Sequence, residues 1–341
     1  MTLLQVRNLH VSYKTYAKTI YATRGVSFDL NQGEVLGIVG ESGCGKSAMA
    51  KALMRLLPLE NASIDEGEVI FEKQDLLKLS EKQMRKIRGN DIGIIFQDPL
   101  SSLNPTMRIG DQIAESLKLH RPKCSRAELK RHIIDLLERI GITDAAMRLR
   151  QYPHELSGGQ RQRVMIAIAL ACNPKLLIAD EPTTALDVTI QAQILEQLKA
   201  LREQTSIILI THDLSIVAGF CDRVLVMYAG EIVEEATCEE LFKHPKHPYT
   251  RRLLQSIPRP DLKLEHRLKA IPGHPPSLTK IKNRCNFCPR CKKAMNICAL
   301  MQPPVFEIAD NHFAACWLYD ERNTHAPVKD QPAEKVLSAQ K

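Results

Sequence analysis

Apolar residues follow two different spacings along the first part of the chain, and each spacing predicts a different kind of element. Four segments contain an unbroken apolar run, which is typical of strands buried on both faces of a parallel sheet. These segments are residues 35–39, 92–98, 175–182 and 205–213. Near the N-terminus, residues 4–6 and 26–30 alternate between apolar and polar side chains, which predicts strands of an antiparallel sheet. Together the two patterns predict an α/β core that begins with antiparallel strands.

Residues 109–170 have a helical pattern instead. Within them, residues 127–140 place apolar side chains at positions i, i+3 and i+4, and Gly141 follows where the helix is expected to stop. We therefore expect a helical subdomain, at about residues 105–172, inserted into the α/β core.

Residues 40–47 read G-E-S-G-C-G-K-S, which is the pattern of a phosphate-binding loop. The motif follows the apolar run at 35–39 and precedes helical spacing at 47–54, so it has the strand–loop–helix context that it requires. In such a loop, backbone N–H groups surround the phosphates, the lysine reaches the β- and γ-phosphates, and the last hydroxyl binds Mg²⁺. The candidate nucleotide-binding residues are Gly40, Ser42, Gly43, Cys44, Gly45, Lys46 and Ser47, with Ser47 also a magnesium ligand. A glycine-rich turn without a ligand is the alternative.

Polar side chains stand at the ends of three of the predicted strands, where α/β sheets place their ligands. Gln97 could contact Mg²⁺ or the attacking water. Asp180 suits Mg²⁺, usually through a water molecule, and Glu181 suits polarising the attacking water. His212 could hydrogen-bond a γ-phosphate. We predict catalytic roles for Gln97, Glu181 and His212, while a loop glutamine, a capping carboxylate and a structural histidine are the plain alternatives.

A second glycine motif, L-S-G-G-Q, occupies residues 156–160. We expect a helix to start near Gln160, so that Gly158 and Gly159 expose backbone N–H groups to a γ-phosphate. The candidate residues of this motif are Ser157, Gly158, Gly159 and Gln160. Tyr13 and Tyr21 are candidates for stacking on a nucleobase, although at least one of them is expected to be an ordinary strand aromatic.

Composition and charge indicate where in the cell the protein is expected and what it is expected to contact. No stretch approaches about 18 consecutive apolar residues, so no segment is expected to span a bilayer. The N-terminus lacks a basic region followed by a long apolar one, so we expect no secretory signal and a cytoplasmic location. The net charge of +8 comes from residues 241–341, which predicts an anionic neighbour for this part: lipid, nucleic acid or a bound cluster.

The 10 cysteines are unevenly placed, because half of them lie between residues 285 and 316. These are Cys285, Cys288, Cys291, Cys298 and Cys316. In a reducing cytosol such a cluster suggests a metal more than disulfides. Zinc held by Cys285 and Cys288 with Cys291 or Cys298 is one possibility, and reduced thiols packed as small apolar groups are another.

The motifs of the first part resemble the ATP-binding-cassette family in their order and spacing. The matching residues are the phosphate loop 40–47, Gln97, the signature 156–160, the acidic strand 176–181, residues 185–187 and His212. The resemblance implies an ABC-type nucleotide-binding domain of the P-loop class, with an antiparallel β subdomain and the inserted helical subdomain. It also implies that two cassettes sandwich ATP, with the phosphate loop of one facing the signature of the other. Asp187 would then communicate across that interface, and Tyr13 would stack on adenine.

A finer resemblance is to the cassettes of oligopeptide and dipeptide importers, the dipeptide-importer cassette in particular. It is carried by residues 96–105, 179–189, 247–250 and 271–273, and by the pattern Cys285…Pro289-Arg290-Cys291…Cys298…Cys316. It implies an ATPase coupled to peptide import, peripheral at the cytoplasmic face of the inner membrane. Its partners would be a second homologous ATPase, two transmembrane permease subunits and an extracytoplasmic peptide-binding protein. Nickel or antimicrobial-peptide uptake by the same machine, or a soluble ATPase acting on nucleic acid or the ribosome, are the alternatives.

The resemblance also assigns roles and boundaries in the C-terminal part. It implies that Cys285, Cys291, Cys298 and Cys316 ligate a 4Fe–4S cluster, with Cys288 as an additional thiol, although their spacing is no standard ferredoxin pattern. The expected domains are a nucleotide-binding domain at 1–256, a Cys-rich oligopeptide-transporter-type domain at 257–322, and a disordered tail at 323–341 that is rich in Pro, Lys and Ala.

Overall fold

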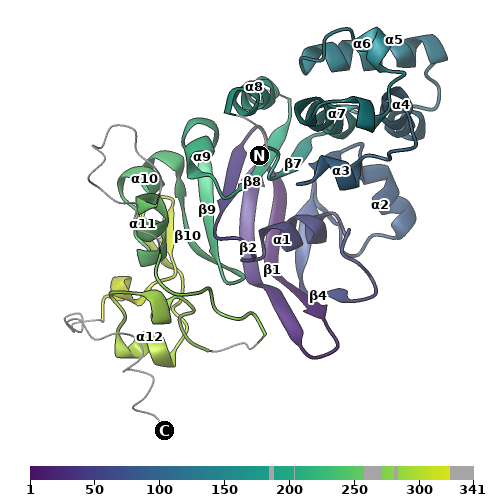
Figure 1. Cartoon of the computed structure of the whole chain (residues 1–341). Coiled ribbons are helices and arrows are strands. Elements are labelled where there is room, and N and C mark those ends of the chain that lie inside the picture. The colour runs from purple at the N-terminus through teal and green to yellow at the C-terminus, as the bar shows by residue number, and fades with distance from the viewer. Residues whose placement is uncertain (184–187, 203, 257–270, 280–282, 323–341) are drawn as a thin grey trace. The chain divides into compact units, whose positions relative to one another are not determined.

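The computed structural model describes residues 1–183, 188–202, 204–256, 271–279 and 283–322. The chain divides into two compact units (Figure 1). The first unit consists of Met1–Leu4, Leu30–Val35 and Phe71–Ile210. The second unit consists of Gln5–Asp29, Leu36–Ile70 and the described residues from Thr211 onward. The tail predicted to be disordered, 323–341, lies outside the described residues.

A parallel sheet forms the core of the first unit. Its strands are β6 (Ile92–Ile95), β7 (Leu176–Asp180) and β8 (Ser206–Thr211), and β7 pairs in parallel with both of the others. Every residue of β7 and β8 is buried. The unbroken apolar runs therefore predicted these strands correctly, because a strand covered on both faces has no position for an exposed polar side chain.

The helices of the first unit follow in chain order. They are α2 (Glu81–Ile87), α3 (Pro99–Ser102), α4 (Ile109–His120), α5 (Arg126–Arg139), α6 (Ala145–Arg148), η1 (Pro153–Glu155), α7 (Gly158–Leu170) and α8 (Val188–Lys199), and the short strand β5 (Gln74–Asp75) precedes them. Helix α5 confirms the helix predicted at 127–140: Ser125 caps it, and Leu129, Ile133 and Leu137 lie on its buried face. Helix α4 packs against both α5 and α7.

The main sheet of the second unit joins the phosphate-loop strand to the Cys-rich segment, by which we mean the described residues 271–279 and 283–322. Its strands follow in the order β11 (Phe306–Ala309), β12 (His312–Ala314), β10 (Glu231–Thr237), β9 (Arg223–Tyr228) and β3 (Val35–Val39). Strands β3 and β9 are parallel, and the pairs formed by β9, β10, β12 and β11 are antiparallel. The Cys-rich segment thus adds two strands to one edge of the sheet, where they run beside β10 in Figure 1.

A further sheet of the second unit contains β2 (Thr19–Asn31), β1 (Thr2–Lys14) and β4 (Ala62–Phe71) in that order. The alternating residues 4–6 and 26–30 lie in β1 and β2, although both strands are far longer than the alternation indicated. The helices of this unit are α1 (Lys46–Leu53), α9 (Leu214–Phe220), α10 (Cys238–Lys243), α11 (Pro248–Gln255), η2 (Cys288–Arg290), α12 (Asn296–Leu300) and η3 (Trp317–Tyr319). Among the described residues, no helix has the length and apolar character needed to cross a bilayer.

Candidate nucleotide-binding site

The phosphate loop joins the fully buried strand β3 to helix α1, which begins at Lys46. Two of its glycines are required by the surrounding backbone. A Cβ atom on Gly40 would lie 2.2 Å from the carbonyl oxygen of Met227, and one on Gly45 would lie 2.0 Å from that of Ala22. Gly45 also has a φ of 109°, a conformation that side chains disfavour. The fold therefore closes tightly around the inner side of the loop.

The other side of the loop is open, and the side chain of its lysine is hydrogen-bonded to the backbone of the loop itself. A Cβ atom on Gly43 would meet nothing within 4 Å. The Lys46 side chain is buried, and its Nζ donates hydrogen bonds to the carbonyl oxygens of Gly40 (2.7 Å) and Glu41 (3.1 Å). Burial raises the pKa of the Cys44 thiol, so this side chain is neutral. A concave loop with one buried ammonium fits a bound triphosphate.

Two residues far away in the sequence hold the start of this loop. The backbone N–H of Glu41 donates to the hydroxyl of Tyr249 (2.8 Å), and the Glu41 carboxylate pairs with the guanidinium of Arg290 at 2.7 and 2.8 Å. This pairing raises the pKa of Arg290. The sequence motifs gave no role to these contacts, because Tyr249 and Arg290 appeared only as parts of a family pattern. No local signal could have linked either residue to the loop.

In the first unit, the end of β7 brings together two of the predicted catalytic residues. Asp180 is the last residue of the strand and is buried. Glu181 follows with a φ of 49°, and its N–H donates to the Ile210 carbonyl oxygen (2.8 Å), which holds it beside β8. The Gln97 amide nitrogen donates to the Glu181 carboxylate (2.9 Å). The left-handed backbone at Glu181 is unfavourable for a residue with a side chain, and such strain concentrates at functional sites.

The remaining predicted residues differ in what surrounds them. His212, in the second unit, is exposed immediately after β8. Tyr13 is half-buried on β1, and burial raises the pKa of its phenol. Asp187 lies outside the described residues. The proposed roles of all three residues remain predictions.

The signature motif forms the N-terminus of helix α7 in the first unit. Ser157 is the N-cap: its hydroxyl accepts from the Gln160 N–H, and the Gln160 side chain accepts from the Ser157 N–H. The helix begins at Gly158, two residues before the predicted start, because this reciprocal capping box fixes the first turn. A Cβ atom on Gly158 would meet nothing within 4 Å. The helix therefore presents an open, positively polarised end.

The five clustered cysteines converge in the second unit. Cys288 and Cys298 are buried with Met295 and Trp317, and Cys285 packs against them. Burial raises the pKa of Cys288 and Cys316 to about 11 and that of Cys291 to about 12. Neighbouring thiols contribute to these increases, and at neutral pH the free thiols are protonated. Among the described residues, no group of three or more His, Cys, Asp or Glu side chains is placed to hold a metal ion, so the side-chain positions support neither the zinc site nor the 4Fe–4S cluster.

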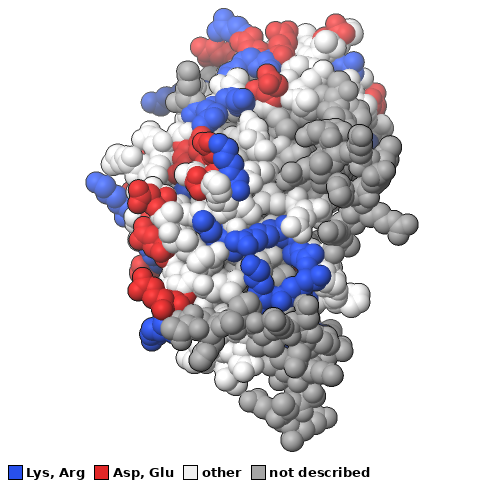
Figure 2. All heavy atoms as spheres, turned by 90° about the vertical axis from the view of Figure 1, so that its left-hand side faces the viewer, with Lys and Arg blue, Asp and Glu red and all other residues white. Residues whose placement is uncertain are grey.

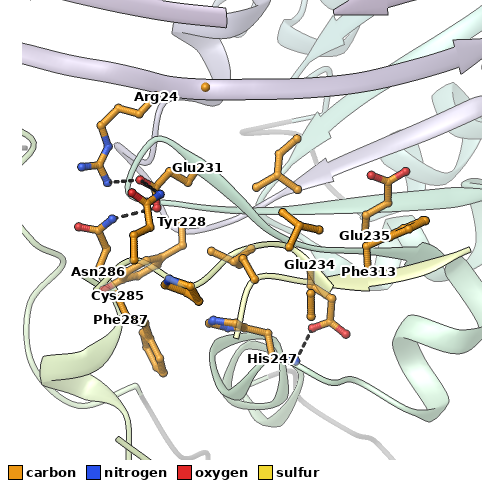
Figure 3. Close-up of a pocket in the computed structure, with 18 of the residues that line it drawn as sticks. Arg24, Tyr228, Glu231, Glu234, Glu235, His247, Cys285, Asn286, Phe287 and Phe313 are labelled. Carbon is orange, nitrogen blue, oxygen red and sulfur yellow. Dashed lines mark hydrogen bonds and ion pairs between the residues drawn. The ribbon is translucent and has the colours of Figure 1, made fainter. Parts of the chain in front are cut away.

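A cavity of about 410 Å³ lies between the strand β10 and the Cys-rich segment. Figure 3 shows Arg24, Glu231 and Asn286 together on one side of it. Glu231 pairs with Arg24 (3.0 Å) and accepts from Asn286 (2.9 Å). Burial raises the pKa of Glu231. These contacts attach the Cys-rich segment to the sheet, because Asn286 belongs to that segment and Glu231 to β10.

Several described cations of the C-terminal part line a second cavity. Figure 2 shows Lys and Arg side chains close together on the face turned toward the viewer. A cavity of about 430 Å³ in the second unit is lined by Arg251, Arg252, Lys292 and Lys293, among others. The last two follow Cys291 directly in the chain, so these cations stand beside the cysteine cluster.

A strand–loop–helix with an inward lysine, and a buried strand that ends in two carboxylates, define a P-loop ATPase of the ATP-binding-cassette fold. A solved dimeric cassette in a post-hydrolysis state, bound to ADP and Pi, is 30% identical with a TM-score of 0.63, covering 69% of this chain and 98% of that one. A profile described as "ABC transporter" matches residues 23–184, and one described as "Oligopeptide/dipeptide transporter, C-terminal region" matches residues 233–298.

Curated relatives match over nearly the whole chain. The dipeptide transport ATP-binding protein of Bacillus subtilis is 51% identical over 95% of this chain and 97% of its own length. The oligopeptide transport ATP-binding protein of the same organism is 52% identical over 98% of this chain and 92% of its own length. The chain belongs to the ABC transporter family, in the group of ATP-binding proteins that carry the oligopeptide/dipeptide transporter C-terminal region. The resemblance found in the sequence is confirmed, as is the α/β cassette fold.

Proposed function

We propose that this chain is the ATP-hydrolysing subunit of a membrane transporter that imports dipeptides or oligopeptides. The observation that carries the proposal is the end-to-end similarity to a dipeptide transport ATP-binding protein, 51% over 95% of the chain. In the proposed assembly the chain works with a second homologous ATPase, two transmembrane permease subunits and an extracytoplasmic peptide-binding protein. It lies peripherally at the cytoplasmic face of the inner membrane, and nucleic acid has no part in its action.

The proposed binding step uses the phosphate loop. Tyr13 stacks on adenine, the loop N–H groups hold the phosphates, and the Lys46 ammonium turns from the Gly40 and Glu41 carbonyls toward the β- and γ-phosphates. Magnesium would be held by Ser47 and Gln97, with Asp180 behind, and when bound it neutralises charge on the phosphate oxygens. Because the Gln97 amide nitrogen is directed at Glu181, its amide oxygen is the atom left to bind a metal.

The proposed hydrolytic step places Glu181 as the group that polarises the attacking water. Gln97 donates to this carboxylate and so orients it. His212 holds the γ-phosphate, and the signature N–H groups of the partner cassette complete the site, as Gly158 and Gly159 of this chain complete the partner's site. Asp187 relays the closed state across the interface.

The surface that receives the permease is proposed to be the groove near residues 98–110. In support, a cavity of about 770 Å³ in the first unit is lined by Thr106, Met107, Arg108 and residues of α4, together with Tyr152. Leu100 and Leu119 are exposed nearby in the chain, at 66% and 67%. The groove follows Gln97 directly in sequence, so a change at the γ-phosphate would reach the permease through a short segment.

The proposal is tested with the Glu181→Gln variant, purified from solubilised membranes in the presence of Mg-ATP. We expect it to bind ATP while its turnover falls at least about a hundredfold, because the water loses its polarising carboxylate. Two multi-span subunits and a second cassette should co-purify. Glu138→Gln, an exposed change on α5, is the matched control and should hydrolyse ATP normally. Near wild-type hydrolysis by Glu181→Gln would refute its role, and ribosomes or nucleic acid in place of membrane proteins would overturn the transport function.

The Cys-rich segment is proposed to bind a 4Fe–4S cluster through Cys285, Cys291, Cys298 and Cys316. The four ligands of such a cluster bind different iron atoms, so they need not surround one ion. Support comes from the grouping of the cysteines in this segment and from Lys292 and Lys293, which follow Cys291 in the chain and would offset the negative charge of a cluster bound by four thiolates. Iron and sulfide should accompany the protein after anaerobic purification, and the Cys298→Ser variant should lose both. A colourless protein with stoichiometric zinc would refute the cluster.

A further inference from the structure

The contact between Arg290 and Glu41 joins the Cys-rich segment to the phosphate loop across 249 residues of sequence. The two terminal guanidinium nitrogens, Nη1 and Nη2, donate to the two carboxylate oxygens at 2.7 and 2.8 Å. The Arg290 side chain is only 5% exposed, and that of Glu41 is 23% exposed. A bidentate pair of this kind is stronger and more directional than an ordinary surface ion pair.

The position of Arg290 is fixed by the Cys-rich segment. It ends the short helix η2, between Cys288 and Cys291. Its Nε donates to the Pro272 carbonyl oxygen (3.0 Å), and its guanidinium also reaches the Tyr228 hydroxyl (3.3 Å). The arginine is therefore oriented by several partners before it meets Glu41.

An aromatic cluster stabilises the same contact. The rings of Tyr228, Tyr249 and Phe287 pack against one another, with centroids 4.6 to 5.5 Å apart. Tyr249 also accepts the Glu41 N–H, while the Glu41 carbonyl accepts from Lys46. Three polar groups of Glu41 are thus held at once, by α11, by the Cys-rich segment and by the loop lysine.

The negative charge of Glu41 makes this contact relevant to ATP binding. Glu41 is the second residue of a loop that receives a polyanion, and an unpaired carboxylate there would repel the phosphates. Lys46 must leave the Glu41 carbonyl to reach them, so the lysine cannot also hold residue 41 in place. Arg290 can do both, because it neutralises the carboxylate and remains bound when Lys46 turns.

We propose that Arg290 of the Cys-rich segment is a positioning residue of the nucleotide site: it neutralises Glu41 and holds the start of the phosphate loop, so that ATP affinity depends on this segment. The inference rests on the proposed ATP site and on no property of the transported substrate. It makes the C-terminal segment part of the ATPase rather than an appendage to it.

The test measures binding of Mg-ATP by the purified full-length chain and the steady-state ATPase of the assembled transporter that contains it. Arg290→Gln should raise the Kd and the KM for ATP about tenfold, with kcat at saturating ATP changed less than about twofold, because the defect is in binding. Arg290→Lys should recover most of the affinity. The double variant Arg290→Gln with Glu41→Gln should also recover it, because the repelling charge is removed.

The matched control is Arg322→Gln, which makes the same substitution at an exposed arginine of the same segment and should leave the Kd unchanged. Wild-type affinity in Arg290→Gln, or a double variant as weak as Arg290→Gln, would overturn the inference. Should Arg290→Gln fail to fold by circular dichroism, Arg290→Lys and the double variant decide the same question. Failure of the wild-type chain to bind ATP would instead count against the nucleotide site itself.

Discussion

The phosphate loop and the signature motif both have glycines at the N-terminal end of a helix, but the structure needs these glycines for different reasons. Within the loop, added Cβ atoms at Gly40 and Gly45 would strike backbone oxygens at 2.2 and 2.0 Å. At Gly158 of the signature, an added Cβ would meet nothing within 4 Å. The loop glycines are therefore required by the fold of their own chain, whereas nothing in the described residues requires Gly158. This difference is expected if Gly158 leaves room for a phosphate supplied with another cassette.

Gly45→Ala should have the largest effect, both on the free energy of unfolding and on ATP binding. The new methyl group would displace the Ala22 backbone and would also strain a residue at φ 109°. We expect a loss of more than about 2 kcal/mol in the free energy of unfolding and about a hundredfold weaker ATP binding. Urea unfolding and nucleotide titration measure both. Gly219→Ala, at a helical glycine of the same unit with no atom within 4 Å, is the control and should not be destabilised. Equal stability of the two variants would show that the fold does not require a glycine at position 45.

Gly158→Ala should separate folding from activity. The change adds helix propensity at the first position of α7, so the stability of the isolated chain should stay the same or rise by up to about 1 kcal/mol. The ATPase of the assembled transporter should fall about tenfold or more, because the methyl group occupies the space in front of the helix N-terminus. Unchanged activity in the assembly would mean that nothing approaches this helix end closely.

Low pH should lower the free energy of unfolding through His247, which is close in the chain to Tyr249, a residue that contacts the phosphate loop. Complete burial lowers the pKa of His247 to about 3, from an ordinary value of 6.5, so the folded state holds this ring neutral. The unfolded chain binds the extra proton below pH 6.5; stability is therefore full above that pH and is lost as the pH falls from about 6.5 toward 3. The slope should approach about 1.4 kcal/mol per pH unit.

Urea unfolding between pH 7 and pH 4 measures this slope in the wild type and in His247→Asn. The asparagine keeps an acceptor for the Tyr249 N–H, which His247 now accepts at 3.1 Å, but it cannot be protonated. The variant should lose most of the acid sensitivity. A slope as steep as that of the wild type would show that other groups are responsible.

The smallest effect concerns the capping boxes of α7 and α5. Ser157→Ala and Ser125→Ala each remove the hydroxyl of an otherwise similar N-cap, so each should cost about 1 kcal/mol of stability. Only Ser157→Ala should also lower the ATPase of the assembly, because only this cap belongs to the signature. Equal activity of the two variants would reduce Ser157 to a structural residue.

The amino-acid sequence by itself specified the elements whose information is local. The unbroken apolar runs located β6, β7 and β8, and the spacing of Leu129, Ile133 and Leu137 located α5. The G-x-x-x-x-G-K-S order identified the phosphate loop, because the backbone geometry of such a loop depends on glycines at fixed positions within eight residues. The juxtaposition of Gln97 with Glu181 also followed from the expectation that ligands gather at the ends of parallel strands.

The start of α7 at Gly158 follows from the local S-x-x-Q capping box, which the glycine pattern by itself did not reveal. Tertiary structure alone decided the rest: β12 pairs with β10, and β11 with β12, without a local hydrophobic signal. The ion pair of Arg290 with Glu41 connects residues 249 positions apart. No local pattern encodes such a contact, because it forms only when the sheet has brought the two ends of the chain together. The sequence by itself thus determined that the chain binds and hydrolyses ATP, and folding decided which distant residues hold the site in place.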